Sequence, residues 1–179
     1  DAAQFAKLDL ICCKLNLDSN DHVIEIGTGW GGFAIHAAKR YGCRVTTTTI
    51  SEAQYTFAKE RIRAEGLEGQ TELLKKDYRH LEGNYSKLVS IEMIEAVGHQ
   101  HLDTYMAKCA SLLEENGCGL IQAITINDQI YDRALKEVDF IKKYIFPGSF
   151  IPSISAILES TKKKSDLRLY NLEDLTSHY

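Results

Sequence analysis

Short apolar runs rich in β-branched residues alternate along the chain with segments whose apolar positions recur at helical spacing. The runs are VIEI from Val23, RVTTTTI from Arg44, TELLK from Thr71, KLVSI from Lys87 and GLIQAITI from Gly119. Runs of this length and composition predict buried β-strands. In the segments between these runs, apolar residues recur at helical spacing. This pattern predicts helices over 33–41, from 51 to about 65, and over roughly 101–113.

The start of the second of these helices carries a capping signal. Ser51 followed three residues later by Gln54 matches the capping box, in which the two side chains bond reciprocally to the backbone of the first turn. Strands that alternate with helices indicate an α/β fold, with a parallel sheet and right-handed crossover helices.

A glycine-rich turn, GTGWGG, follows the first predicted strand. Its spacing fits GxGxxG, the dinucleotide pattern, and also ExGxGxG, a pattern typical of S-adenosylmethionine sites. In parallel α/β sheets ligands bind beyond the carboxyl ends of the strands, where the strand order switches. We therefore expect the turn to form the floor of a ligand site, with Gly27, Gly29 and Gly31 allowing close approach of the backbone.

The residues after the other strands favour S-adenosylmethionine over a dinucleotide. A dinucleotide site places an acid at the end of the second strand, and TTTTIS has none before Glu52. Glu25 can organise the glycine turn and the ammonium of the ligand, or be a satisfied carboxylate at a strand end. Asp77 follows the third strand and can accept a hydrogen bond from an adenine amino group, or be a solvated loop acid. An NAD-linked oxidoreductase is the competing class.

Composition narrows the class of protein further. The 179 residues are 44% apolar and 26% charged, which is typical of one soluble globular domain, and the net charge of −4 gives no general attraction to nucleic acid. No apolar run approaches the roughly 20 residues of a membrane span. Five cysteines without a CxxC motif indicate reduced thiols in a cytoplasmic protein. His99 and His101 have no evident third ligand, so we expect no metal site.

Several segments together resemble one enzyme family. VIEIGTGWGGFA, TTTISEAQ, KKDYRHL, KLVSIEMIEAVG and YIFPGSFIPS are similar to the cyclopropane fatty-acyl-phospholipid synthases and the mycolic acid cyclopropane synthases. The resemblance covers essentially the whole chain. It implies a Rossmann-like class I methyltransferase fold, with helices on both faces of a mostly parallel sheet. Family members are longer at both ends, so we expect residues 1–179 to be one methyltransferase domain, a fragment incomplete at its C-terminal strands.

The resemblance also implies contacts with S-adenosylmethionine. It assigns the ribose to Gln54, whose alternative role is the capping box with Ser51. It places Tyr78 beside Asp77 in the adenine pocket, where an aromatic ring can cover the base. Trp30, inside the turn, can shape the cofactor or acyl pocket, or simply pack. The expected cofactor-binding residues are Glu25, Gly27, Gly29, Trp30, Gly31, Gln54, Asp77 and Tyr78.

The reaction implied by the resemblance is transfer of a methyl group to the cis double bond of an unsaturated phospholipid acyl chain, followed by closure of a cyclopropane ring. The glutamate that matches Glu95 holds a bicarbonate ion that takes the proton, and a tyrosine that matches Tyr179 contacts the same ion. A bicarbonate-binding histidine of the family falls at Gln122, which can donate a hydrogen bond but cannot carry charge. The sequence therefore supports the prediction of methyl transfer more strongly than that of ring formation. Glu95 can alternatively be a helix-start carboxylate favoured by the helix dipole.

A lipid-facing insertion is expected over residues 128–155. In FIKKYIFPGSFIPSI, from Phe140, aliphatic groups can meet an acyl chain while Lys142 and Lys143, with 162–164, meet anionic headgroups at the inner membrane surface. The alternative is a core-packing helix with solvated lysines. Other open functions are a methyl-branched or methylene-bearing product, another small-molecule methyltransferase, and a cofactor-binding module without catalysis.

Overall fold

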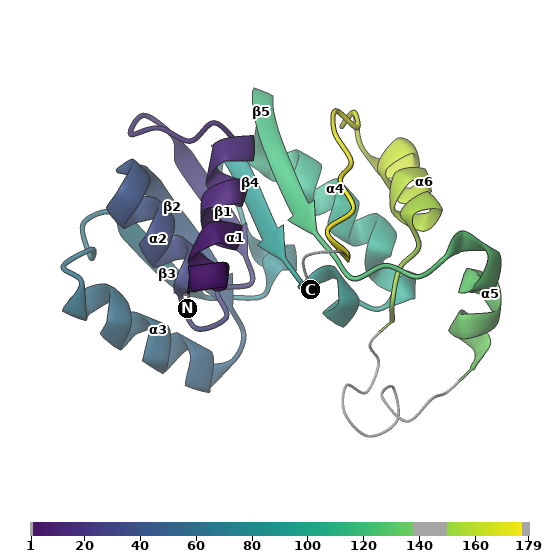
Figure 1. The fold of residues 1–179 in the computed structure, drawn as a ribbon, viewed down its shortest axis with the longest axis horizontal. Helices are drawn as coiled ribbons and strands as arrows, with labels where there is room; N and C mark the ends of the chain where they lie inside the picture. The colour runs from purple at the N-terminus through teal and green to yellow at the C-terminus, as the bar shows by residue number, and fades with distance from the viewer. Residues whose placement is uncertain (1, 138–149, 177–179) are drawn as a thin grey trace.

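The computed structural model describes residues 2–137 and 150–176. Within them, five parallel strands form the central layer of an α/β fold (Figure 1). Their bounds are β1 His22–Ile26, β2 Arg44–Thr49, β3 Thr71–Lys75, β4 Tyr85–Ile91 and β5 Leu113–Gln122. The parallel sheet predicted from the alternation of strands and helices is confirmed.

The strand order, β3-β2-β1-β4-β5, places β1 at the centre. The chain moves outward from β1 to β3 and then returns to the other side of β1 with β4. The strand order therefore reverses between β1 and β4, where ligands bind in sheets of this kind. The glycine turn follows β1 directly and lies at this switch point.

Helices cover both faces of the sheet, as expected (Figure 1). Alternate residues of a strand point to opposite faces, and the two hydrophobic clusters follow this alternation: Val23 belongs to the first cluster and Ile24 to the second. The first cluster includes side chains of α1 Ala2–Lys14, α2 Gly32–Tyr41 and α3 Glu52–Ala64. The second includes side chains of α4 Leu102–Leu112, α5 Asp128–Lys136 and α6 Ile154–Lys164.

The predicted capping box of α3 is only half formed. The Ser51 hydroxyl accepts a hydrogen bond from the backbone amide of Gln54, as predicted. The Ser51 amide, however, donates to Oγ1 of Thr49 at 3.1 Å, and Oε1 of Gln54 accepts from the same hydroxyl at 2.7 Å. Thr49 therefore takes the position that a capping box gives to the glutamine, because the end of β2 brings its hydroxyl between the two groups.

The last predicted strand differs from the observed one at both ends. It begins at Leu113 rather than Gly119, because a bulged register allows Leu113 to pair with Tyr85 of β4. It ends at Gln122 rather than 126, and the amide of Ile124 bonds to a side chain. Among the described residues, none of the helices is both long and apolar enough to span a bilayer.

Candidate active site

The glycine turn after β1 has the backbone geometry that its sequence predicts. Gly27, Gly29 and Gly31 have φ angles of +100°, +51° and +80°, in the left-handed region that glycine adopts readily. The amides of Gly27 and Thr28 both donate to the carbonyl of Thr48, at 3.2 and 2.9 Å. The turn is thereby attached to the end of β2, at the carboxyl edge of the sheet.

The three glycines differ in what surrounds them. A Cβ on Gly27 would lie 3.2 Å from Cγ of Met93, and a Cβ on Gly31 would lie 3.2 Å from Cβ of Ala58. A Cβ on Gly29 would meet no other atom of the described structure within 4 Å. Gly27 and Gly31 therefore lie in tight contact with the protein itself, whereas Gly29 borders open space that a ligand can occupy.

Glu25 is buried, with 2% of its surface exposed, and its Oε2 accepts a hydrogen bond from Oγ1 of Thr47 at 2.5 Å. Burial raises the pKa of this carboxyl to about 8. The Thr47 hydroxyl lies 2.7 Å from that of Thr28, inside the glycine turn. Glu25 thus has the predicted link to the turn, through two hydroxyls, whereas its contact with a ligand ammonium stays a prediction.

Asp77 and Tyr78 follow β3 and begin a single 3-10 turn, η1 Tyr78–His80. Both carboxylate oxygens of Asp77 accept from the Arg79 guanidinium, at 3.0 and 2.7 Å, and these hydrogen bonds lower the pKa of Asp77 to about 2. The ring of Tyr78 packs edge-on against buried Tyr105, with centroids 5.4 Å apart. Asp77 is therefore an ordered, ionised carboxylate, and its bond to adenine stays a prediction.

Trp30 is 55% exposed, and its ring contacts Phe57 of α3 edge-on, with centroids 5.3 Å apart. The carbonyl of Trp30 accepts a hydrogen bond from Nη1 of Arg61 at 2.6 Å. Both contacts hold the tip of the turn against α3. One edge of the indole therefore packs within the protein. The exposed remainder can still border a ligand.

Glu95 lies in η2 Ile94–Ala96, just after β4. Its Oε1 accepts a hydrogen bond from the amide of Ile124 at 2.5 Å. Its Oε2 is buried and has no hydrogen-bond partner among the described residues. Burial raises the pKa of this carboxyl above its usual range, against the lowering effect of the Ile124 amide. A buried carboxyl oxygen without a partner is costly, which is characteristic of a functional group.

Gln122 ends β5, and its Nε2 donates to Oε1 of Glu92 at 3.0 Å. The Glu92 amide donates in return to the carbonyl of Gln122. Glu92 has φ +50°, which is uncommon for a residue other than glycine, and it also pairs with Lys7 of α1. Tyr179, the third predicted catalytic residue, lies outside the described residues.

Four residues of this region were missed by sequence reasoning: Thr28, Thr47, Glu92 and Met93. Glu92 had a usable signal, because it directly follows a predicted parallel strand and therefore lies at the carboxyl edge. Thr47 had none, since TTTTIS offers four equivalent threonine hydroxyls and only the register of β1 with β2 selects Thr47. Thr28 lies inside the glycine turn, but only its contact with Thr47 reveals its role.

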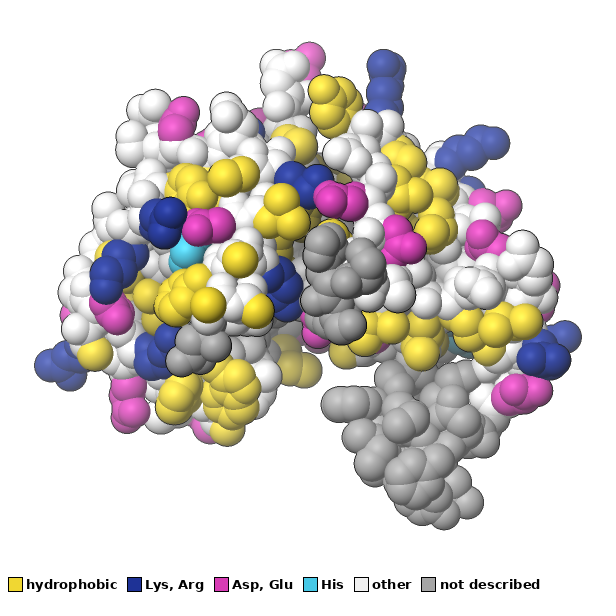
Figure 2. All heavy atoms as spheres, in the orientation of Figure 1, with side chains coloured by type: hydrophobic (Ala, Val, Ile, Leu, Met, Phe, Trp, Pro, Cys, Tyr) yellow, Lys and Arg dark blue, Asp and Glu magenta, His cyan; other side chains and the backbone are white. Residues whose placement is uncertain are grey.

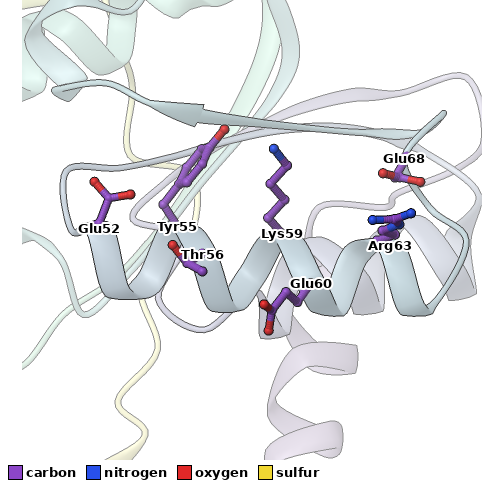
Figure 3. A pocket seen from close by; sticks show the side chains of 7 residues that line it. All are labelled: Glu52, Tyr55, Thr56, Lys59, Glu60, Arg63 and Glu68. Atoms are coloured by element: carbon purple, nitrogen blue, oxygen red, sulfur yellow. The ribbon is translucent and has the colours of Figure 1, made fainter.

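A surface hollow of about 330 Å³ lies along α3 (Figure 3). Its lining residues are Glu52, Tyr55, Thr56, Lys59, Glu60, Arg63 and Glu68. Charges of both signs are present among them. The hollow is lined by charged and polar side chains of α3 and of the segment after it, and by no residue of the predicted site.

The family model for mycolic acid cyclopropane synthetase matches residues 1–179. The chain belongs to that family. The resemblance seen in its motifs is thereby confirmed over the whole chain.

Two relatives show how far the likeness extends. The chain is 38% identical over 178 residues to tuberculostearic acid methyltransferase of Mycobacterium tuberculosis. It is 39% identical over 162 residues to the cyclopropane-fatty-acyl-phospholipid synthase of Escherichia coli K12. These alignments cover 99% and 90% of the chain but only 42% and 40% of the relatives. The chain therefore spans about two fifths of their length.

A solved member of the family has the same fold. The mycolic acid cyclopropane synthase CmaA1, in complex with SAH and CTAB, superposes with a TM-score of 0.79 at 26% identity. The match covers 89% of the chain and 59% of that structure. The class I methyltransferase fold predicted from the resemblance is confirmed.

Proposed function

We propose that the chain binds S-adenosylmethionine and is the methyl-transferring part of a lipid methyltransferase. The proposed reaction is methylation of the cis double bond of an unsaturated phospholipid acyl chain, with closure to a cyclopropane ring. The observation that carries the proposal is the glycine turn at the switch point of the sheet, which is attached to β2 and borders open space at Gly29.

The residues around this turn are suited to the cofactor. S-adenosylmethionine supplies an electrophilic methyl group when it is bound. The left-handed turn would hold its amino-acid part, Gln54 its ribose and Asp77 its adenine amino group, with the ring of Tyr78 beside the base. Glu25, which is buried, would hold the turn in place through the hydroxyl of Thr47. All of these residues lie on or after the carboxyl ends of β1, β2 and β3.

The acyl chain makes different demands on the site. An alkene is a poor nucleophile, so it must be aligned with the methyl donor in a pocket that excludes water. Methylation leaves positive charge on the acyl chain, which aromatic faces can stabilise. Loss of a proton from the added methyl group then closes the ring. Glu95 is the residue suited to holding the base for this step, since one carboxyl oxygen accepts from the Ile124 amide and the other is buried without a partner among the described residues.

The contact between Gln122 and Glu92 favours a second candidate product. The resemblance implies a bicarbonate ion held by Glu95, Tyr179 and Gln122, but the side-chain amide of Gln122 donates to the Glu92 carboxylate. That carboxylate would repel an anion placed beside it. If no bicarbonate binds, proton loss elsewhere on the chain gives a methyl-branched or methylene-bearing product instead of a ring.

Lipid contact is proposed for the side of the molecule formed by α5 and α6. Figure 2 shows hydrophobic side chains exposed on this side, and the exposed aliphatic residues there include Ile130, Ile151, Ile154 and Leu158. The three lysines that end α6 are exposed too. Phe150, by contrast, is buried in the second hydrophobic cluster, so this position follows the core-packing alternative. Residues 138–149 of the predicted insertion lie outside the described residues.

The cofactor is tested by thermal denaturation of the chain. One series contains S-adenosylhomocysteine (SAH), which is the demethylated form of the cofactor, and a second series contains NAD. A ligand that binds only the folded state raises the melting temperature. We expect SAH to raise it and NAD to leave it unchanged. Stabilisation by NAD alone would favour the oxidoreductase class.

The product is tested by mass spectrometry of lipids from cells that express the full-length protein. A gain of one CH₂ with loss of unsaturation indicates a ring. The same gain with the double bond retained indicates a methylated alkene. Unchanged lipids in those cells would contradict both lipid products.

A further inference from the structure

Three buried polar side chains connect the centre of the sheet to the glycine turn. Glu25 lies on β1, Thr47 lies beside it in the register of β2, and Thr28 lies in the turn. Their exposed fractions are 2%, 0% and 3%. Oε2 of Glu25 is 2.5 Å from Oγ1 of Thr47, which is 2.7 Å from Oγ1 of Thr28.

The direction of these two hydrogen bonds follows from the number of protons. A threonine hydroxyl has one hydrogen to donate, and that of Thr47 goes to Glu25. With Glu25 accepting, the second bond is donated by Thr28 to Thr47; a protonated Glu25 can instead donate to Thr47, and Thr47 then donates to Thr28. The hydroxyl of Thr28 is therefore directed into the protein, away from any ligand above the turn.

Thr28 is held by its backbone as well as by its side chain. Its amide donates to the carbonyl of Thr48 at 2.9 Å, and its carbonyl accepts from the amide of Gly31 at 2.9 Å. Its two neighbours, Gly27 and Gly29, both have left-handed backbone conformations. Glycine has the largest conformational freedom of any residue. The hydrogen bonds of Thr28 therefore restrict a turn whose neighbouring residues are otherwise flexible.

We propose that Thr28 and Thr47 are positioning residues that preorganise the glycine turn for the cofactor, with Glu25 as the buried carboxyl that ends the chain of hydrogen bonds. Ordering a flexible turn on binding costs free energy, and a turn that is already ordered avoids this cost. The inference rests on the proposed cofactor site and adds two residues to it that do not touch the ligand.

The neighbouring threonine supplies a matched control. Thr46 is also buried, 1% exposed, but its side chain faces the opposite side of the sheet. Its hydroxyl bonds to the ring of His22 and to Glu72 rather than to the turn. Thr46→Val and Thr47→Val each remove one buried hydroxyl from adjacent positions of one strand, and only the second removes a contact with the turn.

The first experiment uses the chain without ligand and measures amide hydrogen exchange over residues 27–31. We expect exchange of the Thr28 and Gly31 amides to quicken about tenfold in Thr47→Val and Thr28→Val, the equivalent of one lost hydrogen bond. Thr46→Val should leave these amides unchanged, even if it lowers the melting temperature. Thr47→Ser, which keeps the hydroxyl, should restore protection.

The second experiment measures SAH affinity by calorimetry. We expect a loss of about tenfold in either valine variant, restoration in Thr47→Ser, and no change in Thr46→Val. The double variant should lose no more than one of the single variants, because the two hydroxyls act as one unit. If Thr47→Val does not fold, Thr28→Val against Thr28→Ser gives the same comparison from inside the turn.

The two hypotheses fail in different ways. Unchanged exchange and unchanged SAH affinity in Thr28→Val and Thr47→Val overturn the positioning role. Absence of SAH binding by the unsubstituted chain overturns the proposed cofactor, and the exchange experiment still decides whether the hydroxyls order the turn.

Discussion

Oε1 of Glu95 accepts a hydrogen bond from the amide of Ile124 at 2.5 Å, and this contact joins the segment after β4 to the segment after β5. The bond holds the carboxyl in one orientation and leaves its second oxygen buried without a partner in the described part of the chain. A carboxyl fixed on one side and unsatisfied on the other is preorganised to bind or transfer a proton.

Glu95→Gln in the full-length enzyme should keep SAH affinity and lower turnover by at least about a hundredfold, as expected when a positioned proton-transfer group is lost. The glutamine can still accept from Ile124, so the local structure should persist. Turnover and SAH affinity are measured on the same preparation, with Glu115→Gln, at an exposed position of β5, as the control. Near-normal turnover would remove Glu95 from the mechanism and the bicarbonate proposal with it.

Gly29→Val should abolish SAH binding in a folded protein. A valine Cβ would enter the space in which we place the ligand, and its left-handed backbone would cost about 1–2 kcal/mol of stability. Gly66→Val is the control, because Gly66 has φ +70° and equally open surroundings but lies after α3. Both variants should lose similar stability in urea, and only Gly29→Val should lose affinity by calorimetry. Equal affinities would contradict the placement of the ligand.

Asp77→Ala should weaken SAH binding by about 1–3 kcal/mol, the cost of leaving a buried polar partner unsatisfied. The control is Asp174→Ala, because Asp174 also accepts from the backbone amide two residues on, in an exposed segment. The pKa of about 2 keeps Asp77 ionised at ordinary pH, so its contribution to affinity should not change between pH 5 and 8. Unchanged affinity in the alanine variant would make Asp77 the solvated loop acid of the alternative interpretation.

Glu25 should make the chain less stable as the pH rises. Its pKa is about 8 in the folded protein because of burial, against roughly 4.3 in an unfolded chain. Between these values the folded state binds the extra proton, so the free energy of unfolding falls by up to about 1.4 kcal/mol per pH unit. Urea denaturation from pH 5 to 8 measures this fall. Glu25→Gln should flatten it, and an equal slope in that variant would contradict the assignment.

Replacement of the lysines at 162–164 by alanine should weaken binding of the full-length protein to anionic vesicles by up to about a hundredfold, since each lysine near such a surface contributes about 1 kcal/mol. Co-sedimentation at increasing salt measures the effect. The control replaces Lys39, Lys59 and Arg63, three exposed cations on α2 and α3. Binding that ignores both salt and lipid charge would contradict the headgroup role.

The sequence by itself determined the described strands, three of the described helices and the family. Apolar periodicity and β-branched runs depend on residues close together in the chain, and they located all five described strands and the glycine turn. The carboxyl-edge rule then placed the residues after those strands in one region. The motifs identified the family, because each is a continuous stretch of sequence.

Only the tertiary structure decided which side chains meet. Thr28 contacts Thr47 across 19 positions, Glu95 contacts Ile124 across 29, and Gln122 contacts Glu92 across 30. The capping role expected of Gln54 is taken by Thr49, in a contact local in sequence that depends on where β2 ends. Such pairs depend on the register between strands and on where each strand ends, and a shift of one residue would turn every side chain to the opposite face. Periodicity along the chain carries no information about that register.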